Sequence, residues 1–180
     1  MIVMKFGGTS VQGAKAIDRV AAIVRERQSQ RPVVVVSALA KITDQLLAMA
    51  AAAGAGQREK ALELARGARE RHYNTAADLL GTHAFEQIAP ELEADFDSLD
   101  ELLRGVVAVG ELTLRTTDAI ASFGERLSSK IAAAAFSQRR QHILDGHATT
   151  CIADAIMLTI SPIPQQGYNA ARSENLNGNG

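Results

Sequence analysis

The sequence has 180 residues, enough for one domain with a hydrophobic core. Its 19 Lys and Arg residues nearly balance 20 Asp and Glu residues, and the net charge of -1 argues against a nucleic-acid or membrane-surface partner. The one cysteine, Cys151, cannot form an internal disulfide, and no stretch has the apolar length of a signal peptide or a membrane span. These features predict a cytoplasmic protein that acts on small molecules or contacts other proteins.

The first 36 residues predict a βαβ unit. Residues 1–6 are apolar apart from Lys5, and the four valines at 33–36 suit a strand buried on both faces. The segment between them has the apolar spacing of an amphipathic helix, with Ile17, Val20, Ile23 and Val24 on one face. This order of elements implies two parallel strands joined by a right-handed crossover.

Two helical regions follow the second predicted strand. An alanine-rich helix is expected over residues 44–53, closed by the glycines after it. Residues 57–104 carry apolar stripes without strand signals, and Gly81 and Pro90 interrupt them. We interpret this region as a helical insert on an α/β core.

A long amphipathic helix is predicted over residues 116–139. Thr116 or Thr117 can cap it, which places Asp118 in its first turn. Its apolar face combines Ile120, Phe123, Leu127 and Ile131.

The remaining residues predict strands and then a tail. Residues 142–145, 150–154 and 156–160 have strand-like patterns. The polar stretch over 165–180 predicts a loop or disorder after a domain that occupies residues 1–164.

The turn after the first strand has the composition of an anion-binding loop. Gly7 and Gly8 lack Cβ atoms, so backbone N–H groups there can approach an anion and the chain can adopt positive φ. Lys5 adds a positive charge, and a helix that starts near Ser10 or Gly13 directs its dipole to the same place. An ordinary tight βα turn with a surface lysine explains the same residues, because the pattern matches neither GxGxxG nor GxxxxGK[ST].

Three further side chains are candidate ligand-binding groups. Ser37 directly follows the second predicted strand, at the edge where open α/β sheets bind ligands. Thr43 is placed to cap the next helix, and both residues are equally explained as caps. Glu125 is flanked by small residues and could receive an ammonium group or remain a solvated helix charge.

The histidines share no spacing, which predicts surface or loop positions and no metal site for His72, His83, His142 and His147.

Three segments together resemble the successive signatures of the aspartokinases, members of the amino acid kinase family. They are KFGGTSV at 5–11, SALAKITDQLL at 37–47 and GELTLRTTDAIASFGERLSS at 110–129. The resemblance extends from residue 1 to about residue 154. It implies a three-layer α/β/α sandwich with a mainly parallel sheet, in which residues 57–104 form the helical insert.

The resemblance also implies a reaction, the ATP-dependent phosphorylation of the side-chain carboxylate of L-aspartate. The product, 4-phospho-L-aspartate, begins lysine, threonine and methionine biosynthesis. By position, Lys5 would be the catalytic group that stabilises charge on the transferred phosphoryl, and Mg²⁺ would bridge the phosphates. The phosphates of ATP would be held by Lys5, Gly7, Gly8, Thr9 and Ser10. The aspartate would be held by Ser37, Thr43 and Glu125, with Glu125 facing its ammonium group.

Two departures from the family pattern bear on this assignment. Lys41 stands where the family usually has glycine, and no TTLGRGGSD segment supplies the family's substrate arginine and catalytic aspartate. The sequence therefore predicts an incomplete, N-terminal portion of the domain, whose exposed sheet edge would favour a homo-oligomer. Two alternatives stay open: a kinase of glutamate, acetylglutamate or a nucleoside monophosphate, and a non-catalytic homologue that binds aspartate or a full-length partner.

Overall fold

A computed structural model of the chain describes residues 2–141. Within this range, two strands and two short 3₁₀ helices accompany four α-helices. In chain order they are β1 (Ile2–Phe6), η1 (Gly8–Val11), α1 (Ala14–Glu26), η2 (Gln28–Gln30), β2 (Pro32–Val36), α2 (Ile42–Gly54), α3 (Arg58–Val109) and α4 (Leu114–Gln141).

The two strands pair in parallel, which confirms the predicted βαβ unit. Ile2 lies opposite Pro32, and Phe6 lies opposite Val36. Helix α1 makes the crossover between them and buries an apolar face that includes Ile17, Val20 and Val24. Ile23, predicted on the same face, is 37% exposed, so the spacing was a sufficient signal for the helix but not for every residue of its buried face.

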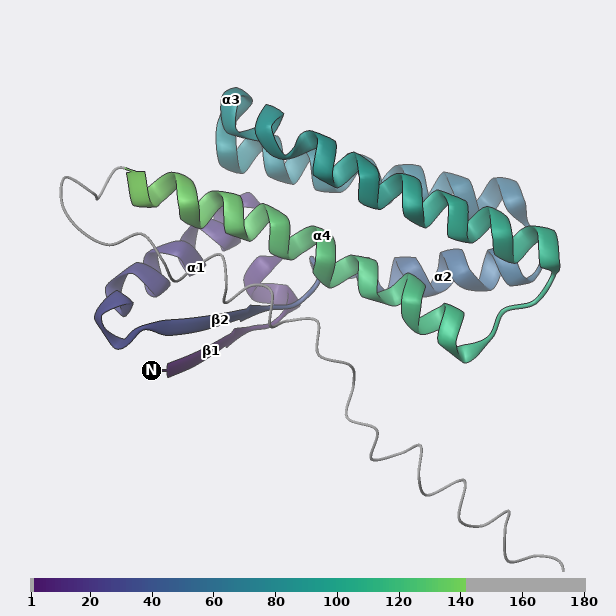
Figure 1. The fold of residues 1–180 in the computed structure, drawn as a ribbon, viewed down its shortest axis with the longest axis horizontal. Helices are drawn as coiled ribbons and strands as arrows, with labels where there is room; N and C mark the ends of the chain where they lie inside the picture. The colour runs from purple at the N-terminus through teal and green to yellow at the C-terminus, as the bar shows by residue number, and fades with distance from the viewer. Residues whose placement is uncertain (1, 142–180) are drawn as a thin grey trace, which may run out of the picture.

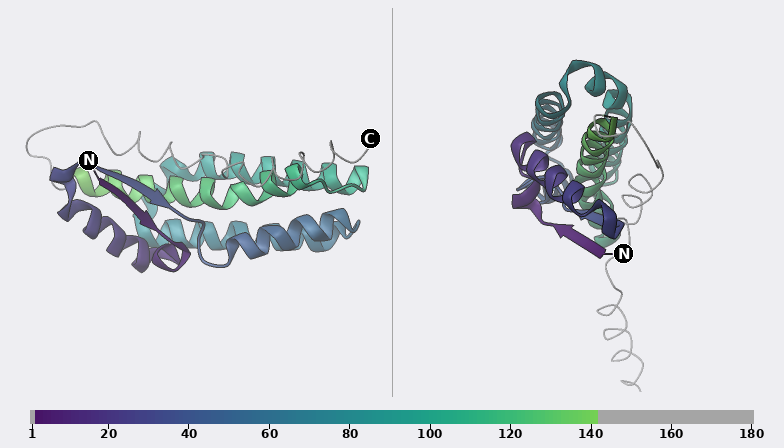
Figure 2. Two further views of the ribbon diagram at one scale, coloured as in Figure 1. Left: turned by 90° about the horizontal axis from the view of Figure 1, so that it is seen from below. Right: turned by 90° about the vertical axis from the view of Figure 1, so that its left-hand side faces the viewer.

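Helices cover one face of this sheet in the part of the chain that the structure describes. Figures 1 and 2 show α1 and α4 on the same side of β1 and β2. Val34 and Val36 point into the core, whereas Val33 and Val35 are half-buried and Val3 is 68% exposed. Burial on both faces, predicted for the four valines, is thus not found among the described residues, because nothing within 2–141 packs fully on the second face.

Helix α3 is a hairpin of two helical arms. Gly81 has φ 71° and ψ 171°, a conformation that suits glycine, and it separates the arms as predicted. Arg69 on the first arm pairs with Glu93 and Asp100 on the second, the latter at 3.2 Å. Pro90 does not break the second arm, contrary to the prediction, and it is exposed, so the carbonyl that loses its N–H partner there can be hydrated.

Helix α4 runs alongside α2 and α3 and continues past the end of the sheet (Figure 1). Its predicted apolar face is confirmed, since Ile120, Phe123, Leu127 and Ile131 are all buried. Its predicted start is wrong. The helix begins at Leu114, and the Oγ1 of Thr113 accepts a hydrogen bond from the N–H of Thr116 at 3.1 Å, so Asp118 lies beyond the first turn.

Helix α2 begins two residues earlier than predicted. Its N-cap residue is Lys41, which has φ 65°, and Thr43 is therefore inside the first turn and does not cap the helix. The C-terminal end of α2 forms a Schellman motif. The N–H of Gln57 donates to the carbonyl of Ala52 at 2.8 Å, and Gly56 has a positive φ of 72°. Gly56 thus ends the helix as expected, whereas Gly54, which was also predicted to close it, is the last residue of the helix.

The strands predicted over residues 142–160, the tail over 165–180, and the domain boundary between 164 and 165 lie outside the described residues. Across residues 2–141, none of the helices combines the length and the apolar character needed to cross a bilayer.

Candidate functional site

The turn after β1 packs against the loop that follows β2. The N–H of Ser37 donates to the carbonyl of Phe6 at 3.0 Å, which continues the parallel ladder to the ends of both strands. A Cβ atom on Gly8 would lie 3.3 Å from the carbonyl oxygen of Ala38, closer than nearly all such contacts. Glycine at position 8 therefore allows the two loops to meet at the carboxyl edge of the sheet.

Helix α4 reaches the same edge with two polar side chains. The Oγ of Ser128 donates to the carbonyl of Ser37 at 2.8 Å. A carboxylate oxygen of Glu125 accepts from the N–H of Ala38 at 3.4 Å. Ser37 and Glu125, 88 positions apart in the sequence, consequently flank the same short stretch of backbone.

Gly124 permits this approach of α4. A Cβ atom there would lie 2.8 Å from the Cβ of Ala38 and 3.3 Å from a methyl group of Leu46. Real Cβ atoms essentially never come that close, so a larger residue would displace the helix. The predicted environment of small residues around Glu125 thus has a structural reason.

Close approach, and not positive φ, explains Gly8, whereas a Cβ atom on Gly7 would meet no atom within 4 Å. Gly7 has φ −74° and ψ 173°, an extended conformation open to any residue, and Gly8 also lies outside the positive-φ region. The expectation of positive φ at this turn is therefore wrong. Gly8 is needed because the chain after β2 is packed against it.

The residues predicted to contact phosphate surround the start of η1. Lys5 is exposed on β1 opposite Val35, and within residues 2–141 its side chain makes neither an ion pair nor a hydrogen bond. Gly7 and Thr9 are exposed as well, and Ser10 is half-buried with its N–H bonded to the carbonyl of Gly7 at 2.9 Å. These groups are available to a ligand at the strand end.

Thr43 and Lys41 border the site from α2 and are both exposed. The left-handed backbone of Lys41 costs a non-glycine residue about 1–2 kcal/mol, and glycine would adopt this conformation without that cost.

Three features of the described residues were not anticipated from the sequence. Ser128 was seen only as a small neighbour of Glu125, although its hydrogen bond to Ser37 joins α4 to the sheet edge. His72 is fully buried, contrary to its predicted surface position. Asp95 is buried too and pairs with α4. A serine at the right helical spacing from Glu125 was the one local signal available for any of them.

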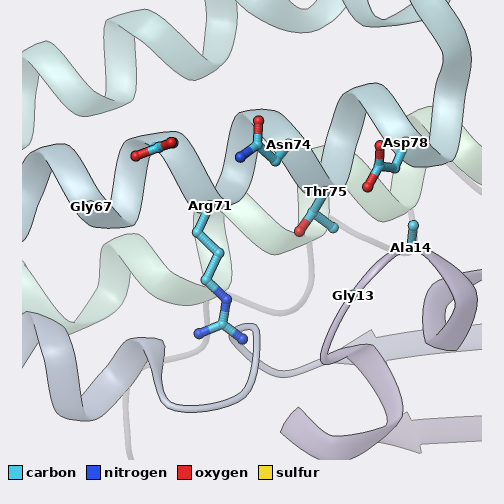
Figure 3. A pocket seen from close by; sticks show the side chains of 8 residues that line it. Gly13, Ala14, Gly67, Arg71, Asn74, Thr75 and Asp78 are labelled. Carbon is cyan, nitrogen blue, oxygen red and sulfur yellow. The ribbon is translucent and has the colours of Figure 1, made fainter.

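A separate pocket lies between the start of α1 and the first arm of α3. It encloses about 380 Å³. Figure 3 shows the side chains of Arg71, Thr75 and Asp78 along the wall that α3 provides. The predicted site residues do not line it, although the start of α1 does. The carboxylates of Glu70 and Asp78 offset the charge of Arg71, which disfavours a simple anion there.

Polar side chains gather at the carboxyl edge of a parallel βαβ unit, the edge at which open α/β sheets bind ligands, and the class of the fold is α/β. Residues 1–177 match the amino acid kinase family, and the chain belongs to this family. The predicted α/β fold is thereby confirmed, with the described part contributing two strands, one helical layer and the insert.

The curated relatives of the chain include aspartokinases. Aspartokinase 3, chloroplastic, of Arabidopsis thaliana is 40% identical over 135 residues, which cover 73% of this chain and 23% of that protein. Aspartokinase 2, chloroplastic, of the same plant is 36% identical over 132 residues, with 72% and 23% covered. The chain therefore spans about a quarter of the length of the relatives it matches.

Solved structures agree. Escherichia coli aspartokinase III in complex with aspartate and ADP superposes with a TM-score of 0.66 at 26% identity, over 78% of this chain and 29% of that one. The same enzyme in complex with lysine and aspartate gives a TM-score of 0.68, with the same identity and coverage. The predicted resemblance to aspartokinases is confirmed at the level of sequence and fold.

Proposed function

We propose that this chain forms the aspartate-binding and phosphate-facing part of an aspartokinase, which transfers a phosphoryl group from ATP to the side-chain carboxylate of L-aspartate. The observation that carries the proposal is the meeting of three separate segments at Ala38: Gly8 contacts its carbonyl, Glu125 accepts from its N–H, and Ser37 precedes it. Relatives named aspartokinases, and a neighbour structure solved with aspartate and ADP, support this choice of substrate and nucleotide.

Each proposed residue has a role that its chemistry allows. The Glu125 carboxylate would pair with the ammonium group of aspartate, and the hydroxyls of Ser37 and Thr43 would hydrogen-bond to its carboxylates. Lys5 would stabilise the negative charge on the phosphoryl group during transfer. Such reactions depend mainly on positioning and electrostatics, and no covalent nucleophile on the protein is needed.

ATP would bind at the strand end. The missing Cβ of Gly8 keeps the loop from Gly7 to Ser10 tight against the chain after β2, beside the exposed Lys5. ATP would supply the phosphoryl group, and Mg²⁺ would arrive bound to its phosphates.

The wider role belongs to the same proposal. The product would be 4-phospho-L-aspartate, which begins lysine, threonine and methionine biosynthesis, and the protein would act in the cytoplasm as a homo-oligomer. The half-covered sheet supports association, because an exposed strand edge and apolar face favour pairing with another chain.

Aspartate binding by the purified chain tests the site. At about 100 times its Kd, a ligand specific to the folded state adds about 2.7 kcal/mol to the free energy of unfolding, which raises the melting temperature by several degrees. Glu125→Gln should remove this rise. Asp118→Asn, which neutralises an exposed carboxylate on the same helix, should keep it. An unchanged rise in Glu125→Gln would place the ammonium site elsewhere.

Competing substrates separate the alternatives. Calorimetric titration with L-aspartate, L-glutamate, N-acetyl-L-glutamate and a nucleoside monophosphate should show binding of aspartate alone. Turnover is then measured as aspartyl hydroxamate formed with ATP and Mg²⁺. Aspartate binding without turnover would favour the non-catalytic alternative, and preference for another acceptor would favour a different member of the family.

A further inference from the structure

Asp95 is a buried carboxylate that holds two cations of α4. It lies on the second arm of α3 and is 4% exposed. Its Oδ1 accepts from Nη2 of Arg126 at 2.5 Å, and its Oδ2 lies 2.8 Å from Nζ of Lys130. Because residues four apart share one face of a helix, both cations project from the same side of α4.

The two cations are fixed by further contacts with the protein. The guanidinium of Arg126 lies 4.5 Å from the ring centroid of Phe123, and Nζ of Lys130 donates to the carbonyl of Glu91 at 3.1 Å. Asp95 and the carbonyl of Glu91 therefore anchor these cations to α3, whereas Phe123 lies on α4 itself and orients the guanidinium of Arg126.

A second face of α4 makes the contacts of the candidate site. Glu125 directly precedes Arg126, and consecutive residues on a helix point about 100° apart. When Arg126 points to Asp95, Glu125 points to the N–H of Ala38, with Ser128 bonded to Ser37 one turn further. A small rotation of α4 would change both sides together.

We propose that Asp95 is a positioning residue, which fixes the rotation and axial position of α4 so that Glu125 faces the backbone after β2. The helical insert thereby helps to build the aspartate site without touching the ligand. The expected effect on aspartate binding rests on the proposed function. The expected effect on the contact between Glu125 and the N–H of Ala38 does not.

Burial explains why this carboxylate is suited to such a role. The Asp95 carboxylate is buried, whereas the side chains of Arg126 and Lys130 are 36% and 31% exposed, so the loss of the cations would leave a buried charge unpaired, which is strongly unfavourable. Rotations of α4 that separate Arg126 or Lys130 from Asp95 are disfavoured for the same reason. Without Asp95, the two neighbouring cations would also repel one another.

The test compares two neutralised carboxylates of the insert in the whole 180-residue chain. Asp95→Asn removes the charge that α4 contacts. Asp100→Asn is the matched control, because Asp100 pairs with Arg69 inside the α3 hairpin. Amide hydrogen exchange at Ala38, followed by NMR, and the Kd for aspartate are measured well below the melting temperature of each variant, where loss of stability alone does not change affinity.

We expect Asp95→Asn to speed exchange at Ala38 and to weaken aspartate binding about tenfold, the lower end of what loss of a supporting residue costs at metal sites. Asp100→Asn should change neither, and Asp95→Glu should restore part of the affinity. If Asp95→Asn does not fold, Lys130→Met removes half of the contact and should show the same two effects more weakly.

The inference is overturned if the Ala38 amide of Asp95→Asn exchanges at the same rate as in the unsubstituted chain. If Asp95→Asn does not fold, the same comparison with Lys130→Met decides. Absence of aspartate binding in the unsubstituted chain would refute the proposed function instead, and the Ala38 amide would still decide the role of Asp95.

Discussion

The imidazole of His72 is enclosed between the two arms of α3. Its Nδ1 lies 2.7 Å from the carbonyl of Ala68, its Nε2 has no partner among the described residues, and its ring meets that of Phe96 edge-on. Burial lowers the pKa of His72 from 6.5 to about 4, against a smaller opposing effect of the Ala68 carbonyl. The folded protein therefore keeps this ring neutral at pH values where the unfolded chain protonates it.

The free energy of unfolding should decrease as the pH is lowered, because of this one residue. The unfolded state binds the extra proton below pH 6.5, so the contribution is fully present above 6.5 and is lost progressively as the pH falls to about 4. Within this window, each pH unit lowers the free energy of unfolding by about 1.4 kcal/mol, and the total loss is about 3 kcal/mol. His72→Leu, compared with the unsubstituted chain by urea unfolding between pH 7.5 and 4, should abolish this part of the dependence.

His83 provides the control, because it is exposed on the same helix. His83→Gln should leave the pH dependence as it is. A His72→Leu variant whose stability declines as steeply as that of the unsubstituted chain would mean that the ring is hydrated in solution.

The burial of His72 could not be predicted from the sequence. It stands in a stripe with Ala61, Ala65, Ala68 and Ala76, all buried, but histidine is as common on surfaces as in cores. The left-handed conformation of Lys41 was equally hidden, since a lysine carries no signal for positive φ.

Among the elements, α4 joins the insert to the site, and Gly124 controls how near it comes. Gly124→Ala adds a Cβ atom 2.8 Å from that of Ala38, so α4 must move outward or Ala38 must shift. Overpacking of this kind typically costs about 1–3 kcal/mol. Urea unfolding should report the loss, and the aspartate response should weaken because Glu125 moves with the helix.

Gly105 on α3 is the matched helical glycine. No atom lies within 4 Å of a Cβ built there. Gly105→Ala should therefore stabilise the chain by about 0.5–1 kcal/mol, through helix propensity alone. Equal effects of the two substitutions would show that α4 is not closely packed on Ala38.

Elements with strong periodicity were predictable, and their ends and partners were not. The βαβ unit, α2 and the apolar face of α4 follow from spacing. The start of α4 was misplaced because Thr113, Thr116 and Thr117 can all cap a helix, and tertiary structure selects Thr113. The pairing of Asp95 with Arg126 joins residues 31 positions apart, and no local pattern encodes it.

At the scale of the molecule, residues 2–141 form a core on one side of a small sheet. The buried side chains run from α1 and β2 through α2 and α3 to α4, whereas Val3 on the other face is 68% exposed. The resemblance to aspartokinases predicts the members of the candidate site, and the structure brings Gly8, Ser37 and Glu125 together. The geometry of the site was not predictable, because these three residues are far apart in the sequence and meet through the packing of α4 against the chain after β2.

The one-sided core makes a prediction for two valines of the sheet. Val34 is 1% exposed, and Val34→Thr places a hydroxyl in an apolar environment without a designed partner, which costs about 1–3 kcal/mol. Val3→Thr should change stability by less than about 0.5 kcal/mol, because threonine suits an exposed strand position. Unfolding in urea at several protein concentrations measures both. If Val3→Thr is as costly as Val34→Thr, the outer face of β1 is covered in solution, and a cost that grows with protein concentration would identify the cover as a second copy of the chain.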